Sequence, residues 1–255
     1  FDCAAAALDL WNELEVREDG GEADTGHLAV RAVARRASPE GFGFTFTDRI
    51  PRTRGLGSSA ATNALGLVAG AAASGRATDA EELLAVGLDL EGHPDNLAAA
   101  LAGGVCLTWD GRVTRIADDA PGVPIAIVPR DATVATHAAR AALPDTVPHA
   151  DAAFSVARAA LLGAAVVSGS VELFAAAAAD RLHEPYRAEH APLLQAVRER
   201  LPDGALGATL SGSGPTVIVW ARPEAAASCS AELAERFSDT DVLHLSISPT
   251  GASRL

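Results

Sequence analysis

The spacing of apolar residues in the first quarter of the chain predicts two strands and two helices. Residues 8–17 alternate in part between apolar and polar positions, and residues 43–50 alternate Phe with Thr, as expected of strands with one buried face. Residues 25–37 place apolar side chains at helical spacing among basic ones, which predicts a short amphipathic helix. After a turn at residues 51–57, residues 58–74 form an Ala-, Leu- and Gly-rich run that predicts a long helix.

Two further helices are predicted from their start signals. Residues 79–90 follow Thr78 and Asp79, either of which can cap a helix, and acidic residues occupy the first turn, where the helix dipole favours them. Residues 94–101 begin with a proline, which is favoured at the first helical position. This part of the chain therefore favours helices over strands.

The second half of the chain predicts strands mixed with helices, after a break at residues 119–122. Before that break, Asp110-Gly111 separates two short strands, as in a two-residue hairpin. Beyond it, the order is strand, helices, strand, strand, helix, strand, an α+β order resembling a split βαβ sandwich. We therefore predict an α+β protein with two domains, residues 1–118 and 119–255. The strands are expected at residues 123–128, 208–210, 216–220 and 242–247, and the helices at residues 135–143, 150–168, 171–179, 192–201 and 223–237.

Composition narrows the class of protein. The net charge of −13, with no cluster of basic residues, argues against a nucleic-acid partner. The three cysteines are widely spaced, which indicates reduced thiols. Apolar stretches such as residues 157–167 are too short or interrupted to span a bilayer, and no signal peptide precedes them. We expect a cytoplasmic protein without a membrane span. Trp11, Trp109 and Trp220 lie in predicted strands and are expected in the core.

The segment from Gly55 to Ala61 is the first candidate for chemistry. It lies between a predicted strand and a predicted helix and reads GLGSSAA. Glycines let backbone amides approach an anion, and the positive end of a helix dipole favours one. Ser58 and Ser59 can cap the helix, donate hydrogen bonds or place an oxygen on a metal. The segment lacks the Lys of a Walker A loop and the spacing of a dinucleotide-binding loop. These residues alone therefore leave a phosphate cradle and a plain helix cap as alternatives.

Several segments together carry a resemblance to a known family. The stretch from Pro51 to Ala61, PRTRGLGSSAA, is similar to the second motif of the GHMP kinases, and LSGSGPT at residues 210–216 resembles their third. The sequence EGHPDN at residues 91–96 resembles the homoserine kinase version of the segment between these motifs. Two more segments, DRLHEPYR at residues 180–187 and Thr136 with the residues after it, also look like homoserine kinase. The resemblance spans nearly the whole chain.

The resemblance implies a fold and an activity. The expected fold is the two-domain GHMP kinase fold, with an N-terminal ATP-binding domain like the second domain of ribosomal protein S5 and a ferredoxin-like C-terminal α/β sandwich. The expected activity is phosphorylation of the side-chain hydroxyl of L-homoserine by ATP with Mg²⁺, in threonine biosynthesis. Phe1-Asp2 resembles the tail of the first motif, so we expect further residues upstream.

The second motif implies the nucleotide site, and two oxygen-bearing residues are candidates for the metal. Ser59 and Glu91 offer the hard oxygen ligands that suit Mg²⁺. Glu91 could equally be a solvated carboxylate at a helix end. The residues expected to bind ATP are Pro51, Arg54, Gly55, Leu56, Gly57, Ser58, Ser59, Ala60 and Ala61.

The acceptor site is expected from the chemistry of an amino acid. A carboxylate calls for Arg, and Arg140 and Arg187 stand at the family's positions, although either alone could be a surface arginine. Asp2 fits the ammonium group, unless it is frayed at the chain end. The expected substrate-binding residues are Asp2, His93, Asn96, Thr136, Arg140, Arg187 and Gly212, and the expected catalytic residues are Glu91, Asp95, Asn96 and Arg140.

Some roles stay open at this point. Asp95 could act as a base or only as a structural group, and Thr136 could be a pocket hydroxyl or a helix N-cap. His183 is expected to brace a helix end. Another GHMP kinase with mevalonate or a sugar as acceptor, and a non-catalytic ligand sensor of the same fold, are the alternative functions. A homodimer is possible.

Overall fold

The computed structural model describes residues 2–92 and 94–255, with the backbone alone at Thr136. It divides into two compact units, and each is described by itself. The linear prediction of domains at residues 1–118 and 119–255 did not anticipate that each unit would take a short segment from the other half. Unit 1 comprises Phe1–Arg52, Gly57–Asp119 and Ile247–Leu255, and unit 2 comprises Thr53–Leu56 and Ala120–Ser246.

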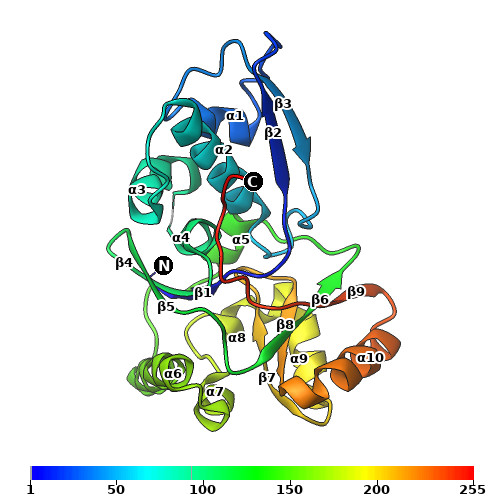
Figure 1. The fold of residues 1–255 in the computed structure, drawn as a ribbon. Coiled ribbons are helices and arrows are strands. Elements are labelled where there is room, and N and C mark those ends of the chain that lie inside the picture. Colours follow the sequence, from blue (N-terminus) through cyan, green and yellow to red (C-terminus); the bar gives the residue numbers. More distant parts are fainter. Residues whose placement is uncertain (1, 93) are drawn as a thin grey trace. The chain divides into compact units, whose positions relative to one another are not determined.

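The described residues of unit 1 include four helices, which Figure 1 labels. They are α1 (Leu28–Val33), α2 (Ser58–Ala73), α3 (Ala80–Glu91) and α4 (Asp95–Ala102). Small residues let α1 and α2 approach closely, since a Cβ added at Gly66 would lie 2.2 Å from the carbonyl oxygen of Ala29. Asp79 caps α3 by accepting a hydrogen bond from the backbone N–H of Glu82 at 3.0 Å, as one of the two predicted caps.

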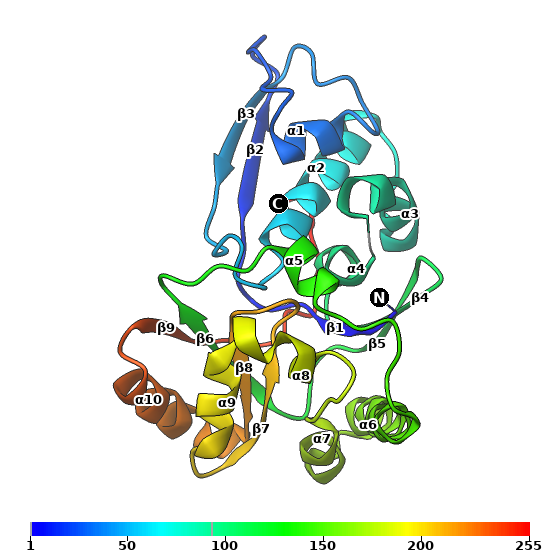
Figure 2. The same ribbon diagram turned by 180° about the vertical axis from the view of Figure 1, so that it is seen from behind.

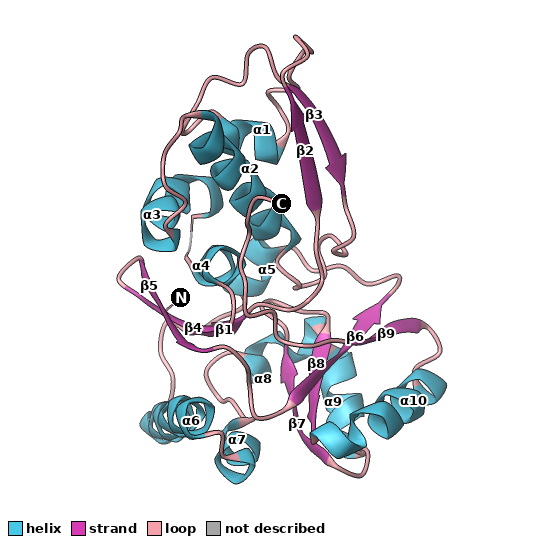
Figure 3. Cartoon of the chain, viewed as in Figure 1, coloured by secondary structure: helices cyan, strands magenta, loops and turns pink. Residues whose placement is uncertain are grey.

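The strands of unit 1 form two small antiparallel sheets (Figure 3). The first has the order β1-β4-β5, and the second is a pair of strands, β2 and β3. Asp110 and Gly111 both have positive φ, 49° and 75°, which makes the tight turn between β4 and β5 as the dipeptide predicted. The strands are β1 (Ala4–Ala6), β2 (Glu13–Arg17), β3 (Gly43–Thr47), β4 (Val105–Trp109) and β5 (Arg112–Ala117).

A four-stranded antiparallel sheet with the order β7-β8-β6-β9 lies at the centre of unit 2. Numbered within this unit, that order is the 4-1-3-2 of a split βαβ or ferredoxin-like sheet, so this expectation is confirmed. In Figure 2, which views the molecule from behind, α9 and α10 lie along this sheet. The strands are β6 (Val123–Pro129), β7 (Ala205–Leu210), β8 (Val217–Ala221) and β9 (Thr240–His244). The helices are α5 (Thr136–Ala141), α6 (His149–Ser168), α7 (Val171–Ala177), α8 (Glu184–Arg187), α9 (Pro192–Glu199) and α10 (Ala226–Arg236), with short 3-10 turns η1 (Ala188–His190) and η2 (Pro223–Ala225).

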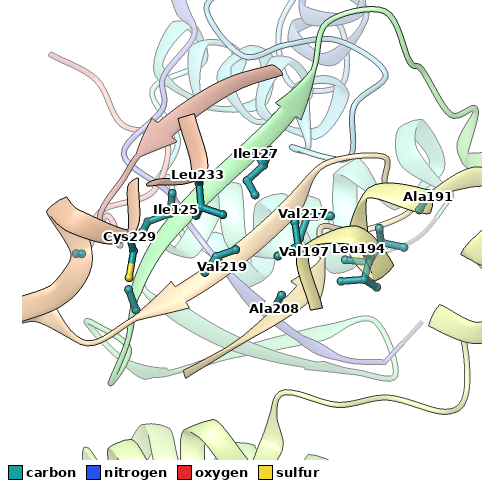
Figure 4. Packing of buried hydrophobic residues seen from close by; sticks show 13 residues of the cluster. Ile125, Ile127, Ala191, Leu194, Val197, Ala208, Val217, Val219, Cys229 and Leu233 are labelled. Atoms are coloured by element: carbon teal, nitrogen blue, oxygen red, sulfur yellow. The ribbon is translucent and has the colours of Figure 1, made fainter. Parts of the chain in front are cut away.

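The core of unit 2 is the apolar layer between this sheet and two helices (Figure 4). Alternate residues of the strands, such as Ile125 and Ile127, point to the same face, as the period of a strand requires. Val197 from α9 and Leu233 from α10 are fully buried against them. Burial of such side chains contributes roughly 1.5–3 kcal/mol each, so this layer stabilises the sheet that carries the loops at its ends.

Three features differ from the sequence expectations. Trp11 and Trp109 remain 38% and 37% exposed, so their assignment to the core was wrong, whereas Trp220 packs edge-on against Phe174 with ring centroids 5.1 Å apart. Helix α8 and strand β1 were not predicted. Helix α6 is long and apolar enough to cross a membrane by length and composition, with 17% of that window buried, whereas the sequence expectation excluded such a span.

Candidate active site

The N-terminus of α2 presents backbone N–H groups that no described side chain caps. Gly57 is the N-cap residue, in the left-handed conformation at φ 71°, and it offers no side chain of its own. Ser58 is therefore the first helical residue rather than the cap, and it is buried, while Ser59 is exposed. The first hydrogen bond of the helix runs from the N–H of Ala61 to the carbonyl of Gly57 at 2.9 Å. Uncapped N–H groups and the helix dipole together favour an anion here.

The two residues proposed for the metal lie against each other in unit 1. The Ser59 hydroxyl donates to Oε1 of Glu91 at 2.7 Å, and the side-chain amide of Asn63 donates to the same oxygen at 2.5 Å. Glu91 is the last residue of α3, and Ser59 and Asn63 are one turn apart on α2. Glu91 is therefore held by two donors and is not simply a solvated carboxylate at a helix end.

The donor chemistry of this pair fits Mg²⁺. A hydroxyl and a carboxylate are hard oxygen ligands, and Mg²⁺ usually takes only one or two protein ligands and keeps water and phosphate oxygens as the others. Asn63 adds a second feature, because its Oδ1 is buried with no hydrogen-bond partner among the described residues. No cluster of three or more His, Cys, Asp or Glu side chains that could hold a metal is found among those residues. The hydroxyl and the carboxylate of this pair thus fit a metal such as Mg²⁺ that also binds phosphate.

The first turn of α4 contributes a second polar group to unit 1. Asp95 Oδ1 accepts from the backbone N–H of Asn96 at 2.7 Å and from its side-chain amide at 3.1 Å. A Cβ added at Gly57 would lie 3.2 Å from Oδ1 of Asn96, so Asn96 lies beside the start of α2. Pro94 is the N-cap residue of α4 and not its first helical residue. His93 lies outside the described residues.

The first part of the glycine-rich loop belongs to unit 2, where it packs against the Gly/Ser turn after β7. The carbonyl of Gly55 accepts from the hydroxyl of Ser211 at 2.8 Å, and the carbonyl of Arg54 accepts from the N–H of Thr216 at 3.3 Å. A Cβ at Gly55, whose φ is 81°, would lie 2.2 Å from the carbonyl oxygen of Ser211. The two predicted motifs therefore meet, and only glycine fits at this contact.

The remaining residues expected to bind ATP lie close to this loop in the chain. Arg54 donates from Nε to the carbonyl of Pro129 at 2.8 Å and from Nη2 to the carbonyl of Arg130, so part of its guanidinium supports the backbone. Pro51, Leu56 and Ala61 are partly buried, and Ala60 is buried in the core of unit 1.

Arg187 is buried in unit 2, so it is not a surface arginine. Arg187 is the last residue of α8 and is 5% exposed. Nε donates to the carbonyl of Ala139 at 3.2 Å, and Nη1 donates to the carbonyl of Gly212 at 3.1 Å and contacts Nδ1 of His183 at 3.3 Å. The structure therefore joins three segments that the sequence placed in one substrate site: α5, α8 and the Gly/Ser turn.

The start of α8 is organised by Asp180. Its Oδ2 accepts the backbone N–H groups of Leu182, His183 and Glu184 at 2.7 to 3.0 Å. Burial alone would raise the pKa of Asp180, but these donors outweigh it and the pKa is lowered. The pKa of His183 is also lowered, chiefly by burial and further by the charge of Arg187, although Asp180 opposes the shift. Neutral His183 can accept a hydrogen bond from Arg187, which fits its expected bracing role.

Three further predicted residues lie in α5 and at the start of the described chain. Arg140 lies in the last turn of α5, directly after Ala139, and is partly exposed. Thr136 is the first residue of α5, but Ala135 is the N-cap residue, so the alternative of Thr136 as N-cap is wrong. Asp2 is exposed. The backbone N–H of the next residue, Cys3, donates to the hydroxyl of Thr108 in β4, and the N–H of Thr108 donates to the carbonyl of Cys3, so the chain is anchored at this point.

Sequence reasoning missed two residues that organise the site. Asn63 was not singled out because an amide inside an Ala-rich helix has no motif around it; its position one turn after Ser59 was the available signal. Glu184 lies within the motif at residues 180–187, but the sequence indicates no role for it. In the structure it is a buried carboxylate three residues before Arg187 that supports the same segment.

Comparisons with known proteins agree with this geometry. The profile of the GHMP kinases N terminal domain matches residues 25–104, and that of the GHMP kinases C terminal domain matches residues 160–239. Homoserine kinase of Streptomyces coelicolor is 38% identical over 252 residues, covering 89% of this chain and 81% of that protein. Homoserine kinase of Gloeobacter violaceus is 37% identical, covering 86% and 81%. The crystal structure of homoserine kinase from Cytophaga hutchinsonii superposes with a TM-score of 0.86 at 25% identity, covering 98% and 91% of the two chains.

The fold and the matched profiles define the class as the GHMP kinases. A mevalonate kinase structure at 14% identity and a TM-score of 0.68 shares the fold alone. Within this class, the chain belongs to the homoserine kinase family, since relatives of that name are 36–38% identical over most of its length. The expected two-domain GHMP kinase fold is thereby confirmed.

Proposed function

We propose that this protein transfers the γ-phosphoryl group of ATP to the side-chain hydroxyl of L-homoserine, giving O-phospho-L-homoserine and ADP in threonine biosynthesis. The hydroxyl oxygen bonds to the γ-phosphorus as the bond to the bridging oxygen of ADP breaks, and the proton of the hydroxyl is released to solvent in the overall reaction. Phosphoryl transfer of this kind depends on positioning and charge neutralisation more than on covalent chemistry. The observation that carries the proposal is a buried arginine, Arg187, beside the Gly/Ser turn of a chain in the homoserine kinase family.

Unit 1 is assigned the phosphates and the metal. The uncapped N–H groups at the start of α2 would bind phosphate oxygens, and Ser59 and Glu91 would hold Mg²⁺. When bound, Mg²⁺ would supply positive charge for the phosphates. Asn63 keeps Glu91 oriented through its amide. The hydrogen bonds from Asn96 to Asp95 support a positioning role for Asp95, while its role as a base stays a prediction that Asp95→Asn can test.

Unit 2 is assigned most of the amino-acid acceptor. Arg140 and Arg187 would bind the carboxylate, because charge-assisted hydrogen bonds between guanidinium groups and carboxylates are strong. Gly212 and Thr136 would border the acceptor. The resemblance alone assigns the ammonium group to Asp2 and the hydroxyl to His93 and Asn96. A neutral sugar would leave the two arginines without a carboxylate, which disfavours that alternative.

A coupled ADP-release assay tests the proposal. The purified protein is supplied with ATP, Mg²⁺ and, in separate reactions, L-homoserine, mevalonate or galactose. We expect turnover with L-homoserine and none with mevalonate or galactose. Turnover only with another acceptor would replace the assignment, and binding of ATP and L-homoserine without turnover would favour the non-catalytic sensor.

A homodimer in the cytoplasm is also proposed. The exposed residues of α6 between its ends are Ala and Val only, and Val156 and Val167 are 67% and 70% exposed. An uncharged apolar face of this length is unusual on a monomer and suits a second copy of the same helix. We propose the dimer and not the membrane as its partner, because α6 packs along α7 and carries Asp151 and Arg158.

A further inference from the structure

Glu184 is a buried carboxylate that the proposed reaction does not use directly. It is the first residue of α8 and is 6% exposed. Oε2 accepts from Nη2 of Arg198 at 2.7 Å, and Oε1 accepts from the backbone N–H of Leu210 at 3.0 Å. Both oxygens of a buried charge are thus satisfied, which a carboxylate in an apolar setting requires.

The hydrogen bond from Leu210 to Oε1 of Glu184 connects α8 to the Gly/Ser turn. Leu210 is the last residue of β7, and the Gly/Ser turn begins with the next residue. Three residues after Glu184, Arg187 donates to the carbonyl of Gly212 in the same turn at 3.1 Å. Residues three apart lie on one face of a helix. Helix α8 is therefore attached to the end of β7 and to the turn at two points, through Glu184 and through Arg187.

Arg198 completes the arrangement from α9. Its Nε and Nη2 donate to the carbonyl of Ala208 at 3.1 and 2.6 Å, so the charge that neutralises Glu184 is itself fixed to β7. Buried ion pairs contribute little net stability compared with apolar residues of the same volume, because desolvation offsets their attraction. An apolar side chain at position 184 could fill the space, but it could not accept the N–H of Leu210. The specific effect of Glu184 is therefore on geometry.

We infer that Glu184 is a positioning residue that sets where Arg187 and the carbonyl of Gly212 lie, and thereby controls acceptor binding. The inference rests on the proposed function for its kinetic consequence only. Its structural consequence concerns the turn at residues 211–216, in which Ser211 and Gly214 donate backbone hydrogen bonds at 2.9 and 2.8 Å. Loss of the Glu184 carboxylate releases the end of β7, and this turn loosens together with α8.

Kinetics of Glu184→Met test the inference. We expect the KM for L-homoserine to rise roughly tenfold or more, since small displacements of a positioning group have effects of this size, while the KM for ATP stays within about twofold. Glu184→Gln keeps an oxygen for the N–H of Leu210 and should restore most of the affinity. The matched control is Glu232→Met, which breaks the ion pair of Glu232 with Arg200 on an exposed surface of the same unit and should change neither KM.

A second variant separates the positioning role of Glu184 from the effect of leaving the Arg198 guanidinium without its carboxylate. In Glu184→Met with Arg198→Met, no arginine is left without its carboxylate, so a well-folded protein is expected even if the single variant is unstable. The double variant should keep the raised KM for L-homoserine. A double variant with wild-type KM would overturn the inference, and so would an equal rise of the KM for both substrates.

Hydrogen exchange makes the result independent of the acceptor. In Glu184→Met and in the double variant, amides at residues 210–214 should exchange faster than in the wild type, and those in Glu232→Met should not. Unchanged exchange at these amides would overturn the inference. If the wild type phosphorylates no L-homoserine, the proposed function fails, but the exchange comparison still decides the role of Glu184.

Discussion

The hydroxyl of Ser59 donates to Oε1 of Glu91 at 2.7 Å, which links the first turn of α2 to the last residue of α3. This hydrogen bond brings the two oxygen-bearing residues proposed for Mg²⁺ together beside an uncapped helix N-terminus. The pair can act as one unit only if the carboxylate is charged and held in place, and Asn63 supplies the second donor that holds it.

Glu91→Gln should lower kcat by about 100-fold or more, because it keeps an oxygen for Ser59 but removes the charge that attracts the metal. The Mg²⁺ concentration that gives half-maximal rate should rise as well, and steady-state assays across a Mg²⁺ series measure both. Glu81→Gln, on the exposed first turn of the same helix, is the control. A wild-type dependence on Mg²⁺ in Glu91→Gln would exclude Glu91 as a metal ligand.

Arg187→Ala should raise the KM for L-homoserine sharply, by about 100-fold, and leave the KM for ATP nearly unchanged, since a charge-assisted pair with a carboxylate is lost. Arg200→Ala, whose side chain is exposed, serves as the control for loss of one arginine. Substrate-saturation curves for both substrates measure the effect. Equal losses for ATP and L-homoserine would mean that Arg187 supports the fold and not the acceptor.

Gly55→Ala should destabilise the protein by more than a positive φ alone explains. The added Cβ would meet the carbonyl oxygen of Ser211 at 2.2 Å, whereas a Cβ at Gly169, with φ 69°, meets nothing within 4 Å. Gly169→Ala should therefore cost about 1 kcal/mol of unfolding free energy, as expected for φ strain, and Gly55→Ala distinctly more. Urea unfolding of the two variants gives the comparison. Equal costs would show that the contact with Ser211 yields easily.

Stability should fall as the pH drops below about 6.5, in part through His183. Its pKa in the folded protein is lowered from the ordinary 6.5, so the unfolded chain binds its proton first as the pH falls. The stability that neutral His183 provides is present above 6.5 and is lost through the window below it. Urea unfolding at pH 7.5 and 5.5 should show a smaller loss in His183→Gln than in the wild type. An identical pH dependence in the two proteins would contradict this sign.

The double variant Val156→Glu with Val167→Glu should convert a dimer into monomers. Both side chains are exposed in the single chain, so the fold should not be lost, but association would bury the new carboxylates, and this opposes the dimer. Sedimentation velocity measures the change. Ala150→Glu, at the exposed start of the same helix, is the milder control. A wild-type monomer would refute the dimer, and flotation of the wild type with lipid vesicles would assign the face to a membrane.

Local signals in the sequence predicted the elements that local forces determine. Asp79 caps α3 because its side chain accepts a hydrogen bond from a residue only three positions away. Asp110-Gly111 makes a hairpin because both residues adopt the positive φ that this turn requires. Strand β1 was missed because Ala4–Ala6 has no alternation, and it exists only through its pairing with β4. Helix α8 was missed because four residues are too short for a helical period, and Asp180 starts it.

The site was predictable as a set of segments but not as a set of contacts. Resemblance placed Arg187 among the substrate residues, yet its burial depends on the carbonyls of Ala139 and Gly212, 48 and 25 residues away. The link between Ser59 and Glu91 likewise depends on packing of α2 against α3, and no spacing in the sequence encodes it.

The exchange of short segments between the two units has a practical consequence for protein engineering. Residues 53–56 lie in the first half of the chain, yet their carbonyls accept hydrogen bonds from Val134, Ser211 and Thr216 of the second. A chimera that borrows residues 120–246 from a relative with another acceptor would leave these three donors facing a foreign loop. Transplanting acceptor specificity therefore requires residues 53–56 and residues 120–246 to be taken from the same relative.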